Sequence, residues 1–329
     1  MILLYGRLDD PPLVRVMEAL QDAGSAYLLL AQENLEHERL RLCVDARGIA
    51  GELTVARQRV PLERITAVYA RPLGTATQGR GAAHAARLNE QLCAWLDVAD
   101  ALVVNRPRAM QANASKPLQA QWIARSGFRV PETLISSDAD EVRAFRREHG
   151  RVVFKSISGI RSIVRELDAK HLARLPLLAR LPTQFQAYVP GMDVRVHVVG
   201  ERTFAAAIDS TAVDYRYAAR DGVEAVLRPF ELPDDVDARC VDMARQMELP
   251  LAGIDLRRRP DGEYVCFEVN PMPAHTYFEA QAGLGISRAV ADLLIAAPTA
   301  PSEVRHGAGR RESDPNHRYR ARAQAAPAP

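Results

Sequence analysis

Apolar runs and helical spacing alternate over the first third of the chain. Short apolar runs at 2–5 and 27–30 are typical of buried strands, and the apolar spacing over 13–23 predicts an amphipathic helix between them. Four further strands and one helix are predicted in this part: strands at 39–44, 51–55, 65–69 and 101–104, and a helix at 82–96. Because strands and helices alternate, we expect an α/β domain with a mainly parallel sheet over residues 1–105.

The pattern changes after Asn113. A helix is predicted to begin at Ser115-Lys116 and to end before Gly127, and a second one, over 140–149, can be capped by Ser137 or Asp138. The apolar strand 152–154 leads directly to Lys155. Burying an unpaired ammonium group is costly, so Lys155 is difficult to explain as a lysine without a function. The small, polar loop 156–162 that follows is suited either to binding phosphate through backbone N–H groups or to making an ordinary hairpin turn.

The last third of the folded region is predicted to be a sheet with helices. A strand, a Pro190-Gly191 turn and a second strand cover 184–199, and on the second strand Asp193, Arg195 and His197 alternate with valines. Another strand is predicted at 204–208, and helices at 235–247 and 287–296. Residues 298–329 contain too few apolar side chains to form a core, which predicts a disordered tail.

Between the last two predicted helices lies the hairpin 251–273, which carries three oxygen donors. Glu268 and Asn270 are two residues apart on one strand, so their side chains share a face. A two-residue Asp261-Gly262 turn would place Asp255 opposite Glu268, whereas a three-residue loop with a bulge would change the register by one. Two carboxylates and an amide suit Mg²⁺, although the three side chains could also be simply solvated.

Composition narrows the class of protein. The 329 residues allow two or three domains, and the formal net charge of +2 disfavours a strongly basic nucleic-acid-binding protein. Charged residues interrupt every apolar run before it reaches membrane-spanning length, and the N-terminus does not have the pattern of a signal peptide. The four cysteines lack zinc or disulfide spacing. We therefore expect a cytoplasmic protein that binds neither nucleic acid nor membrane. The sequence leaves open whether the protein forms a homo-oligomer.

Taken in order, the segments from about 105 to 295 resemble the ATP-grasp superfamily, in its RimK-like branch of carboxylate–amine ligases. The motifs Val68-Tyr69-Ala70-Arg71-Pro72 and Asp214-Tyr215-Arg216 resemble those of graspetide (microviridin-type) peptide ligases. The resemblance implies an α/β protein with the ATP-grasp fold, in which an N-terminal α/β domain is followed by two α+β subdomains that enclose ATP. Its expected parts are an N-terminal domain at 1–105, a central subdomain at 106–185, a C-terminal subdomain with the metal site at 186–297, and the tail.

The resemblance also implies roles for individual residues. Lys116 and Lys155 match the phosphate-binding lysines, although Lys116 could instead be an ordinary helix-surface lysine. The expected nucleotide site further comprises the lid over the phosphates and the hinge that contacts adenine: Ser156, Gly159 and Arg161 in the lid, and Gln186, Ala187, Tyr188 and Val189 in the hinge. The family often has Glu in place of Ala187, so only a backbone contact would survive there.

The remaining implied roles concern the reaction centre. Asp193 matches an acidic residue that faces the ribose or the reacting groups, and Arg195 and Arg216 match contacts to phosphates or to an acyl-phosphate. Asp255, Glu268 and Asn270 match the ligands of Mg²⁺, with two ions expected and Mn²⁺ as an alternative. His197 shares the strand face, and a structural role is expected for it rather than a catalytic one.

The implied reaction is an ATP-dependent ligation that releases ADP. A carboxylate attacks ATP to form an acyl-phosphate, and an amine or a hydroxyl then displaces phosphate. A peptide or protein is the preferred substrate. The alternatives are a RimK-like ligase that joins an amino acid or glutamate to a small acceptor, and an ATP-binding sensor without turnover. An intact set of Asp255, Glu268, Asn270 and Lys155 argues against the sensor.

Overall fold

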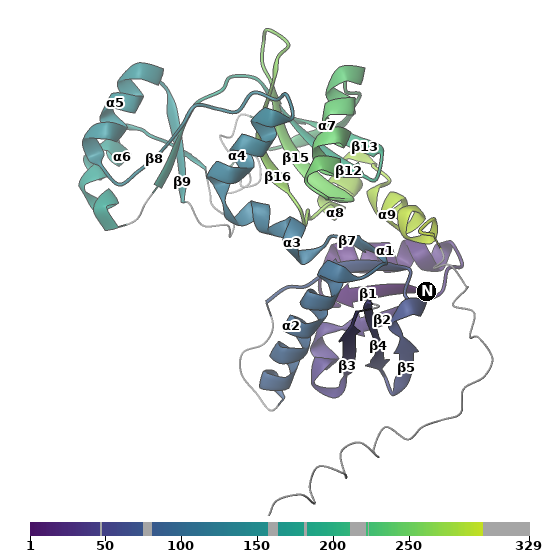
Figure 1. Ribbon diagram of the computed structural model, residues 1–329. Coiled ribbons are helices and arrows are strands. Elements are labelled where there is room, and N and C mark those ends of the chain that lie inside the picture. The colour runs from purple at the N-terminus through teal and green to yellow at the C-terminus, as the bar shows by residue number, and fades with distance from the viewer. Residues whose placement is uncertain are drawn as a thin grey trace, which may run out of the picture. The chain divides into compact units, whose positions relative to one another are not determined.

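The computed structural model describes residues 1–46, 48–74, 81–156, 164–180, 183–210, 222 and 224–298. Residues Met1–Pro298 form one compact unit. The segment for which a disordered tail is predicted lies, apart from Pro298, outside the described residues. The described part mixes helices with several sheets (Figure 1), which confirms the predicted fold class.

The N-terminal part is built on a four-stranded parallel sheet with the order β2-β1-β6-β7. Its strands are β1 (Ile2–Gly6), β2 (Tyr27–Ala31), β6 (Ala67–Arg71) and β7 (Leu102–Val104). The helices of this part are α1 (Pro11–Asp22), α2 (Ala82–Val98) and α3 (Pro107–Met110), with short 3₁₀ turns η1 (Gln32–His37), η2 (Leu62–Arg64) and η3 (Gln111–Ala114). All five residues of β1 are buried, as a strand covered on both faces requires, which explains its unbroken apolar run.

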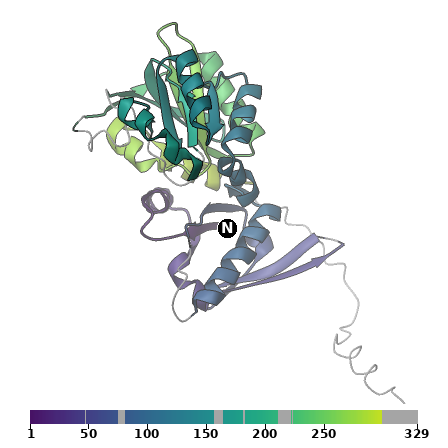
Figure 2. The same cartoon turned by 90° about the vertical axis from the view of Figure 1, so that its left-hand side faces the viewer.

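Two strands expected in this parallel unit belong instead to a separate antiparallel sheet. β3 (Arg39–Asp45), β4 (Gly48–Val55) and β5 (Gln58–Pro61) pair in the order β3-β4-β5 (Figure 2). The sequence pattern did not indicate β5, because the β4–β5 turn consists of Ala56 and Arg57. These residues adopt φ values of 48° and 68°, a conformation usually taken by Gly, Asn or Asp.

A second sheet, with the order β10-β9-β11-β8, is antiparallel along its length. Its strands are β8 (Thr133–Ser136), β9 (Val152–Ser156), β10 (Arg165–Glu166) and β11 (Thr183–Ala187). Helices α5 (Ala139–His149) and α6 (Ala169–Ala173) and the 3₁₀ turn η4 (Leu175–Arg180) accompany this sheet, whereas α4 (Lys116–Arg125) packs on the largest sheet, which has five strands. Asp138, one of the two predicted caps, accepts hydrogen bonds from the Asp140 and Glu141 amides at the start of α5.

The largest sheet has five antiparallel strands in the order β14-β13-β12-β15-β16. The strands are β12 (Met192–Val199), β13 (Arg202–Asp209), β14 (Val226–Phe230), β15 (Leu251–Arg258) and β16 (Tyr264–Asn270). The helices are α7 (Asp234–Gln246), α8 (Thr276–Ala282) and α9 (Ile286–Ile295). One face of β12 contributes Val194, Val196 and Val198 to a core shared with α7, which leaves Arg195 and His197 on the other face.

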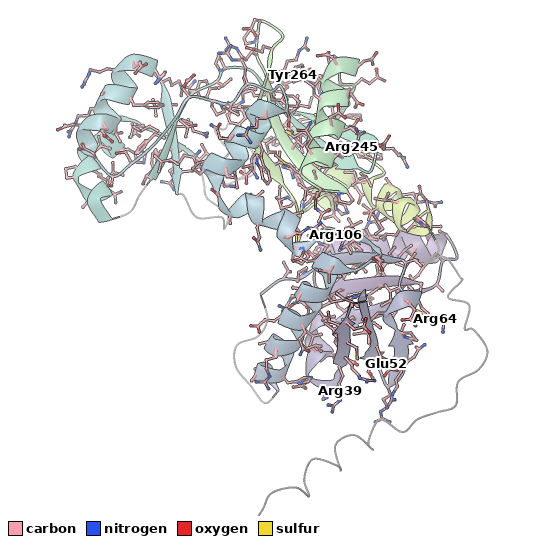
Figure 3. All side chains as sticks on the ribbon, viewed as in Figure 1. Arg39, Glu52, Arg64, Arg106, Arg245 and Tyr264 are labelled. Atoms are coloured by element: carbon pink, nitrogen blue, oxygen red, sulfur yellow. The ribbon has the colours of Figure 1, made fainter. Side chains whose placement is uncertain are left out.

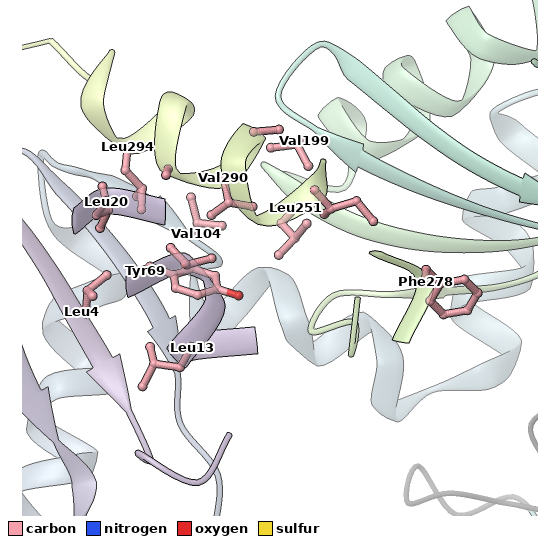
Figure 4. Close-up of a cluster of buried hydrophobic side chains, with 14 of the residues drawn as sticks. Leu4, Leu13, Leu20, Tyr69, Val104, Val199, Leu251, Phe278, Val290 and Leu294 are labelled. Atoms are coloured by element: carbon pink, nitrogen blue, oxygen red, sulfur yellow. The ribbon is translucent and has the colours of Figure 1, made fainter. Parts of the chain in front are cut away.

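A continuous apolar core joins the parallel sheet to the five-stranded sheet. Figure 4 shows Leu4, Leu13 and Tyr69 from the N-terminal part beside Val290 and Leu294 of α9, and all five are almost fully buried. Burial on this scale positions the N-terminal part firmly against the strands that carry the predicted metal ligands. Among the described residues, no helix is long and apolar enough to cross a membrane.

Candidate active site

The register of the β15–β16 hairpin decides whether the two predicted carboxylate ligands meet. Its turn is the three-residue alternative: Arg259 N–H donates to Glu263 O at 2.8 Å, and Gly262 takes the left-handed conformation with φ of 88°. That turn pairs Leu256 with Cys266, which by itself would place Asp255 opposite Phe267. A register shift between Leu256 and Asp255 makes Phe267 the extra residue of a bulge, so that Asp255 pairs with Glu268.

The bulge brings a row of charged side chains onto one face of the sheet. Arg195 of β12 pairs with Asp255 of β15, which in turn pairs with Glu268 of β16. Arg195 Nη1 lies 2.6 Å from Asp255 Oδ1, and the arginine side chain is only 7% exposed. In the next row, Gly253 pairs with Asn270, whose Oδ1 accepts a hydrogen bond from Met272 N–H at 2.9 Å. Asp255, Glu268 and Asn270 therefore share one face of two adjacent strands.

Gly253 makes room for the arginine in this row. A Cβ atom at position 253 would lie 2.1 Å from Arg195 Nη2 and 2.8 Å from Pro273 Cβ. Both approaches are closer than real Cβ atoms tolerate, so a larger residue would displace the guanidinium or the loop after Asn270. The absence of a side chain at Gly253 is thus a condition for the Arg195–Asp255 ion pair.

Two lysines from different elements converge on Glu268. Lys116, the first residue of α4, places Nζ 2.5 Å from Glu268 Oε1 and 2.9 Å from Asn113 Oδ1. Lys155, near the end of β9, places Nζ 3.9 Å from Glu268 Oε2. Each lysine side chain is 9% exposed, so neither is an ordinary surface lysine. Glu268 is thus an anionic partner of both lysines, and the alternative of an ordinary helix-surface Lys116 does not fit this geometry.

An open cleft of about 760 Å³, including its solvent side, begins at these charges and runs between the β10-β9-β11-β8 sheet and the five-stranded sheet. Apolar side chains, among them Val153, Ile208, Leu256 and Phe267, line much of it. The sequence-predicted residues that line it are Lys155, Gln186, Ala187, Tyr188, Val189, Asp193, Asp255 and Glu268. An apolar slot that ends in cations and carboxylates is suited to a planar base with attached phosphates.

Hydrogen bonds within the protein restrict how the hinge can contact a ligand. The amides of Ala187 and Tyr188 donate to the carbonyls of Glu132 and Arg151, each at 2.9 Å. Val189 is the next hinge residue, and its carbonyl accepts from Arg257 Nη1 at 2.9 Å. Of these three amides, the Val189 N–H is therefore the one that remains for a base, whichever side chain stands at position 187.

Asp193 is held by an arginine that the sequence patterns did not single out. Arg257 donates to both Asp193 carboxylate oxygens at 2.8 Å, a bidentate geometry. The Arg257 guanidinium also lies 5.6 Å from the ring centroid of Tyr188 and 5.4 Å from that of Phe267. Arg257 thus fixes Asp193 and one wall of the cleft together. Its signal in the sequence was its position two residues after Asp255, on the same strand face.

Two buried residues of the N-terminal part support the loop after Asn270, and they were not predicted as site residues. Asn105 donates from Nδ2 to the carbonyls of Leu251 and Pro271, and its Oδ1 accepts from Leu251 N–H at 3.1 Å. Arg71 forms a buried ion pair with Asp10 and donates to Pro273 O at 3.2 Å. Arg71 belongs to the motif 68–72 noted in the sequence, which is the one signal that pointed to it.

His197 lies two residues after Arg195 on β12, on the same face of the sheet. It is fully buried and packs at 4.9 Å, ring to ring, against Phe278. Burial, reinforced by Arg195 and His275, holds the pKa of His197 well below its usual value, so the ring is neutral at physiological pH. His197 does not line the cleft, which agrees with the expected structural role.

Three of the predicted site residues, Gly159, Arg161 and Arg216, lie outside the described residues, and nothing is described of the Ser156 side chain.

Within the described residues, no three side chains drawn from His, Cys, Asp and Glu converge as a metal cluster. The predicted metal ligands are two carboxylates with an amide, and they fit hard-oxygen coordination of Mg²⁺ on one shared face.

Comparison with known proteins adds to this geometry. The model of the RimK-like ATP-grasp domain matches residues 113–294. Beta-citrylglutamate synthase B of Danio rerio is 28% identical over 204 residues, which cover 59% of this chain and 50% of that protein. The chain thus spans about half the length of the curated relatives it matches.

Solved structures share the fold over nearly the whole described chain. The ATP-grasp ligase PsnB, complexed with a phosphomimetic variant of its minimal precursor, Mg and ADP, matches with a TM-score of 0.76 and 27% identity. The match covers 90% of this chain and 98% of PsnB. The macrocyclase MdnC from Microcystis aeruginosa, bound with precursor peptide MdnA, has a TM-score of 0.74. At 20% identity over 90% of this chain and 99% of MdnC, it shows the fold alone. The chain belongs to the RimK-like ATP-grasp family.

Proposed function

We propose that this protein is an ATP-dependent ligase that activates a carboxylate as an acyl-phosphate and forms an amide or ester bond on a peptide or protein. The observation that carries the proposal is the convergence of Lys116 and Lys155 on Glu268, at the charged end of an apolar cleft. Cations beside carboxylates at this point can bind both nucleotide phosphates and the metal ions that accompany them.

The nucleotide would enter with its base against the hinge 186–189 and its phosphates toward the two lysines. Asp255, Glu268 and Asn270 would hold Mg²⁺, two ions in our proposal with Mn²⁺ as a substitute, and the metal would neutralise phosphate charge. In that state Glu268 would exchange its lysine contacts for metal, because one carboxylate cannot satisfy all of these cations at once. Lys116 and Lys155 would then be available to the phosphates.

The charges of the site address the difficulty of the first chemical step. A carboxylate oxygen attacks the γ-phosphorus of ATP, an anion approaching an anion, while the bond to the ADP oxygen breaks. Lys155 and Arg195, with Arg216 proposed beside them, would lower this repulsion. An amine nitrogen or a hydroxyl oxygen then attacks the acyl carbon and phosphate leaves, with the proton of the nucleophile passing to solvent. Asp193 is proposed to face the ribose or the reacting groups.

Two of the solved structures favour a peptide or protein as the substrate. PsnB and MdnC were solved with precursor peptides, and both match 90% of this chain, the N-terminal part included.

We propose a division into an N-terminal domain at 1–105, a central subdomain at 106–185 and a C-terminal subdomain at 186–297. We place the protein in the cytoplasm, where ATP is available; all four of its cysteines are free, as expected there.

A second candidate function has its own support. Beta-citrylglutamate synthase B joins small molecules by its name, and its similarity covers 59% of this chain. A ligase that adds an amino acid or glutamate to a small acceptor would use the same nucleotide cleft. The two candidates differ in the acceptor and donor, not in the first step.

The deciding experiment is nucleotide turnover with Mg²⁺, in which ADP and AMP are measured separately. Purified chain is incubated with ATP and either an acidic peptide encoded beside its gene or a mixture of free amino acids. ADP release stimulated by the peptide, with loss of one water from the peptide mass, is the expected result. Stimulation by free amino acids alone would favour the second candidate. Binding of ATP without turnover would indicate a sensor, and AMP as product would contradict the acyl-phosphate route.

A further inference from the structure

A second groove lies in the N-terminal part, on elements that contribute nothing to the nucleotide cleft. It encloses about 820 Å³, its open side included, between β3 and β4 of the three-stranded sheet and helix α2. Three residues on one side of α2, His84, Leu88 and Gln91, form one wall. His84 Nε2 contacts Glu38 O at 2.9 Å and so ties the helix to the residue before β3.

The groove follows the free edge of β3. Side chains alternate between the faces of a strand, yet the consecutive residues Arg39, Leu40 and Arg41 all line the groove. Within the described part of the chain, β3 pairs only with β4 in the order β3-β4-β5, so its other edge carries backbone groups that no strand of this sheet satisfies. An extended chain in the groove could pair with that edge.

The groove is positively charged. Arg39 and Arg41 of β3 and Arg59 of β5 line it and are all exposed, and Glu52 is the one carboxylate among its described lining residues. The register places Arg39 beside Thr54 and Arg59 in one row, and Arg41 beside Glu52 in the next. Arg59 Nε lies 3.7 Å from Glu52 Oε1, and neither Arg39 nor Arg41 forms an ion pair within the described residues. Figure 3 labels Arg39 and Glu52 on this sheet.

We infer that this groove binds an extended, acidic segment of the substrate polypeptide as an added strand on β3. The inference rests on the proposed function, because a peptide whose side-chain carboxylates are activated must carry Asp or Glu residues. Carboxylates on alternate residues of such a strand would face Arg39 and Arg41, which are themselves two residues apart. Backbone pairing would supply affinity, and the arginines would supply the preference for an acidic sequence.

The groove would hold the substrate away from the reacting atoms. Strand β3 has seven residues, enough to pair with a segment of similar length. A segment bound there raises the effective concentration of the remaining chain at the cleft without contributing to the chemistry. The groove variants should therefore change the affinity for the peptide and its KM, with little change in kcat.

The direct test uses fluorescence anisotropy with a labelled peptide of alternating Glu and Val residues, in the absence of ATP. The full chain should bind it, and a peptide with Lys in place of Glu should bind far more weakly. The double variant Arg39→Glu/Arg41→Glu should weaken binding by about tenfold or more, since each reversal replaces an attraction by a repulsion. Arg39→Gln/Arg41→Gln is the milder alternative if the reversal impairs folding. Methylating alternate backbone nitrogens of the peptide should also weaken binding, because pairing with β3 needs those N–H groups.

The matched control is Arg125→Glu/Arg147→Glu, which reverses two exposed arginines on α4 and α5 and should leave peptide binding unchanged. Equal loss in both double variants would indicate a general charge effect and overturn the inference. So would tighter binding of a single-stranded oligonucleotide at the groove, or a change of oligomeric state in the groove variant on sedimentation. If the groove variants process peptide with unchanged KM, the groove inference fails while the ligase stands. If no variant, wild type included, turns over ATP with any peptide, the proposed function itself fails.

Discussion

Asp255 lies directly opposite Glu268 because Phe267 is the extra residue of a bulge in β16. The three-residue turn at 260–262 would otherwise have placed Asp255 opposite Phe267 and turned Glu268 to the other face of the sheet. Bulges frequently occur beside active sites, where they redirect a side chain. Here the bulge restores the alignment of two carboxylates that the turn alone would separate.

Replacing Glu268 tests the centre of the site. Glu268→Gln keeps the size of the side chain and removes the charge that Lys116 and Lys155 contact. We expect Mg²⁺-dependent ADP release to fall by about 10²–10³-fold, with little change in melting temperature, because the metal loses a carboxylate ligand. Glu263→Gln, at the hairpin turn, is the control and should retain activity. Retained activity in Glu268→Gln would remove the metal assignment.

Replacing Lys155 tests the phosphate role. The chain has only three lysines among 329 residues, and two of them meet at Glu268. Lys155→Met should weaken ATP binding by about 10- to 100-fold, the value of a charge-assisted hydrogen bond to a phosphate. Lys170→Met, the third lysine, is exposed and serves as the matched control. Isothermal titration would measure both, and an unchanged affinity in Lys155→Met would count against the role.

The space at Gly253 yields a separate prediction. Gly253→Ala introduces a Cβ atom that would collide with Arg195 Nη2. We expect the Arg195–Asp255 pair to be displaced and ADP release to fall, with a loss of about 1–3 kcal/mol in the free energy of unfolding from overpacking. Gly285→Ala, where no atom lies within 4 Å of the new Cβ, should change neither quantity by much. Full activity in Gly253→Ala would show that Arg195 need not stay where it is.

Asn105 should matter for stability. Asn105→Ala would leave the buried carbonyls of Leu251 and Pro271 and the Leu251 N–H without their side-chain partner. Unsatisfied buried groups of this kind cost about 1–3 kcal/mol each, so we expect a loss of about 2–4 kcal/mol in urea denaturation. The exposed Asn34→Ala is the control. A change below about 0.5 kcal/mol, typical of a surface substitution, would contradict the bridging role.

His275 should make stability depend on pH. Burial, with Arg71 next in importance, lowers the pKa of His275 to about 3. Between that value and the unfolded pKa of about 6.5, only the unfolded state binds the proton, so acid favours unfolding. The free energy of unfolding should therefore fall by about 1.4 kcal/mol for each pH unit below about 6.5 through this residue.

The variant His275→Gln isolates this contribution. Denaturation curves between pH 7 and pH 5 should show a shallower loss of stability for His275→Gln than for the wild type. His197, which is also buried with a lowered pKa, still titrates in the variant, so part of the slope should remain. The exposed His37→Gln should keep the wild-type slope. Identical slopes for the wild type and His275→Gln would show that His275 is protonated in the folded state.

The sequence by itself determined the fold class, the order of most strands and helices, and the residues to be considered for the site. Local patterns carry this information, since apolar periodicity and turn residues act over a few positions along the chain. Lys155 at the end of an apolar strand and Glu268 with Asn270 on one strand face could be recognised in this way. The scarcity of lysine was a further signal in the sequence.

Only the tertiary structure decided which of these residues meet. The bulge at Phe267, the strand that follows the Ala56-Arg57 turn, and the support of the loop by Asn105 and Arg71 involve partners distant in the chain. Such contacts depend on packing between elements, where a shift of one residue in register moves a side chain to the opposite face. For that reason residue spacing alone could not predict that Lys116 and Lys155 converge on Glu268. The family resemblance implied a phosphate-binding role for each lysine but not this contact.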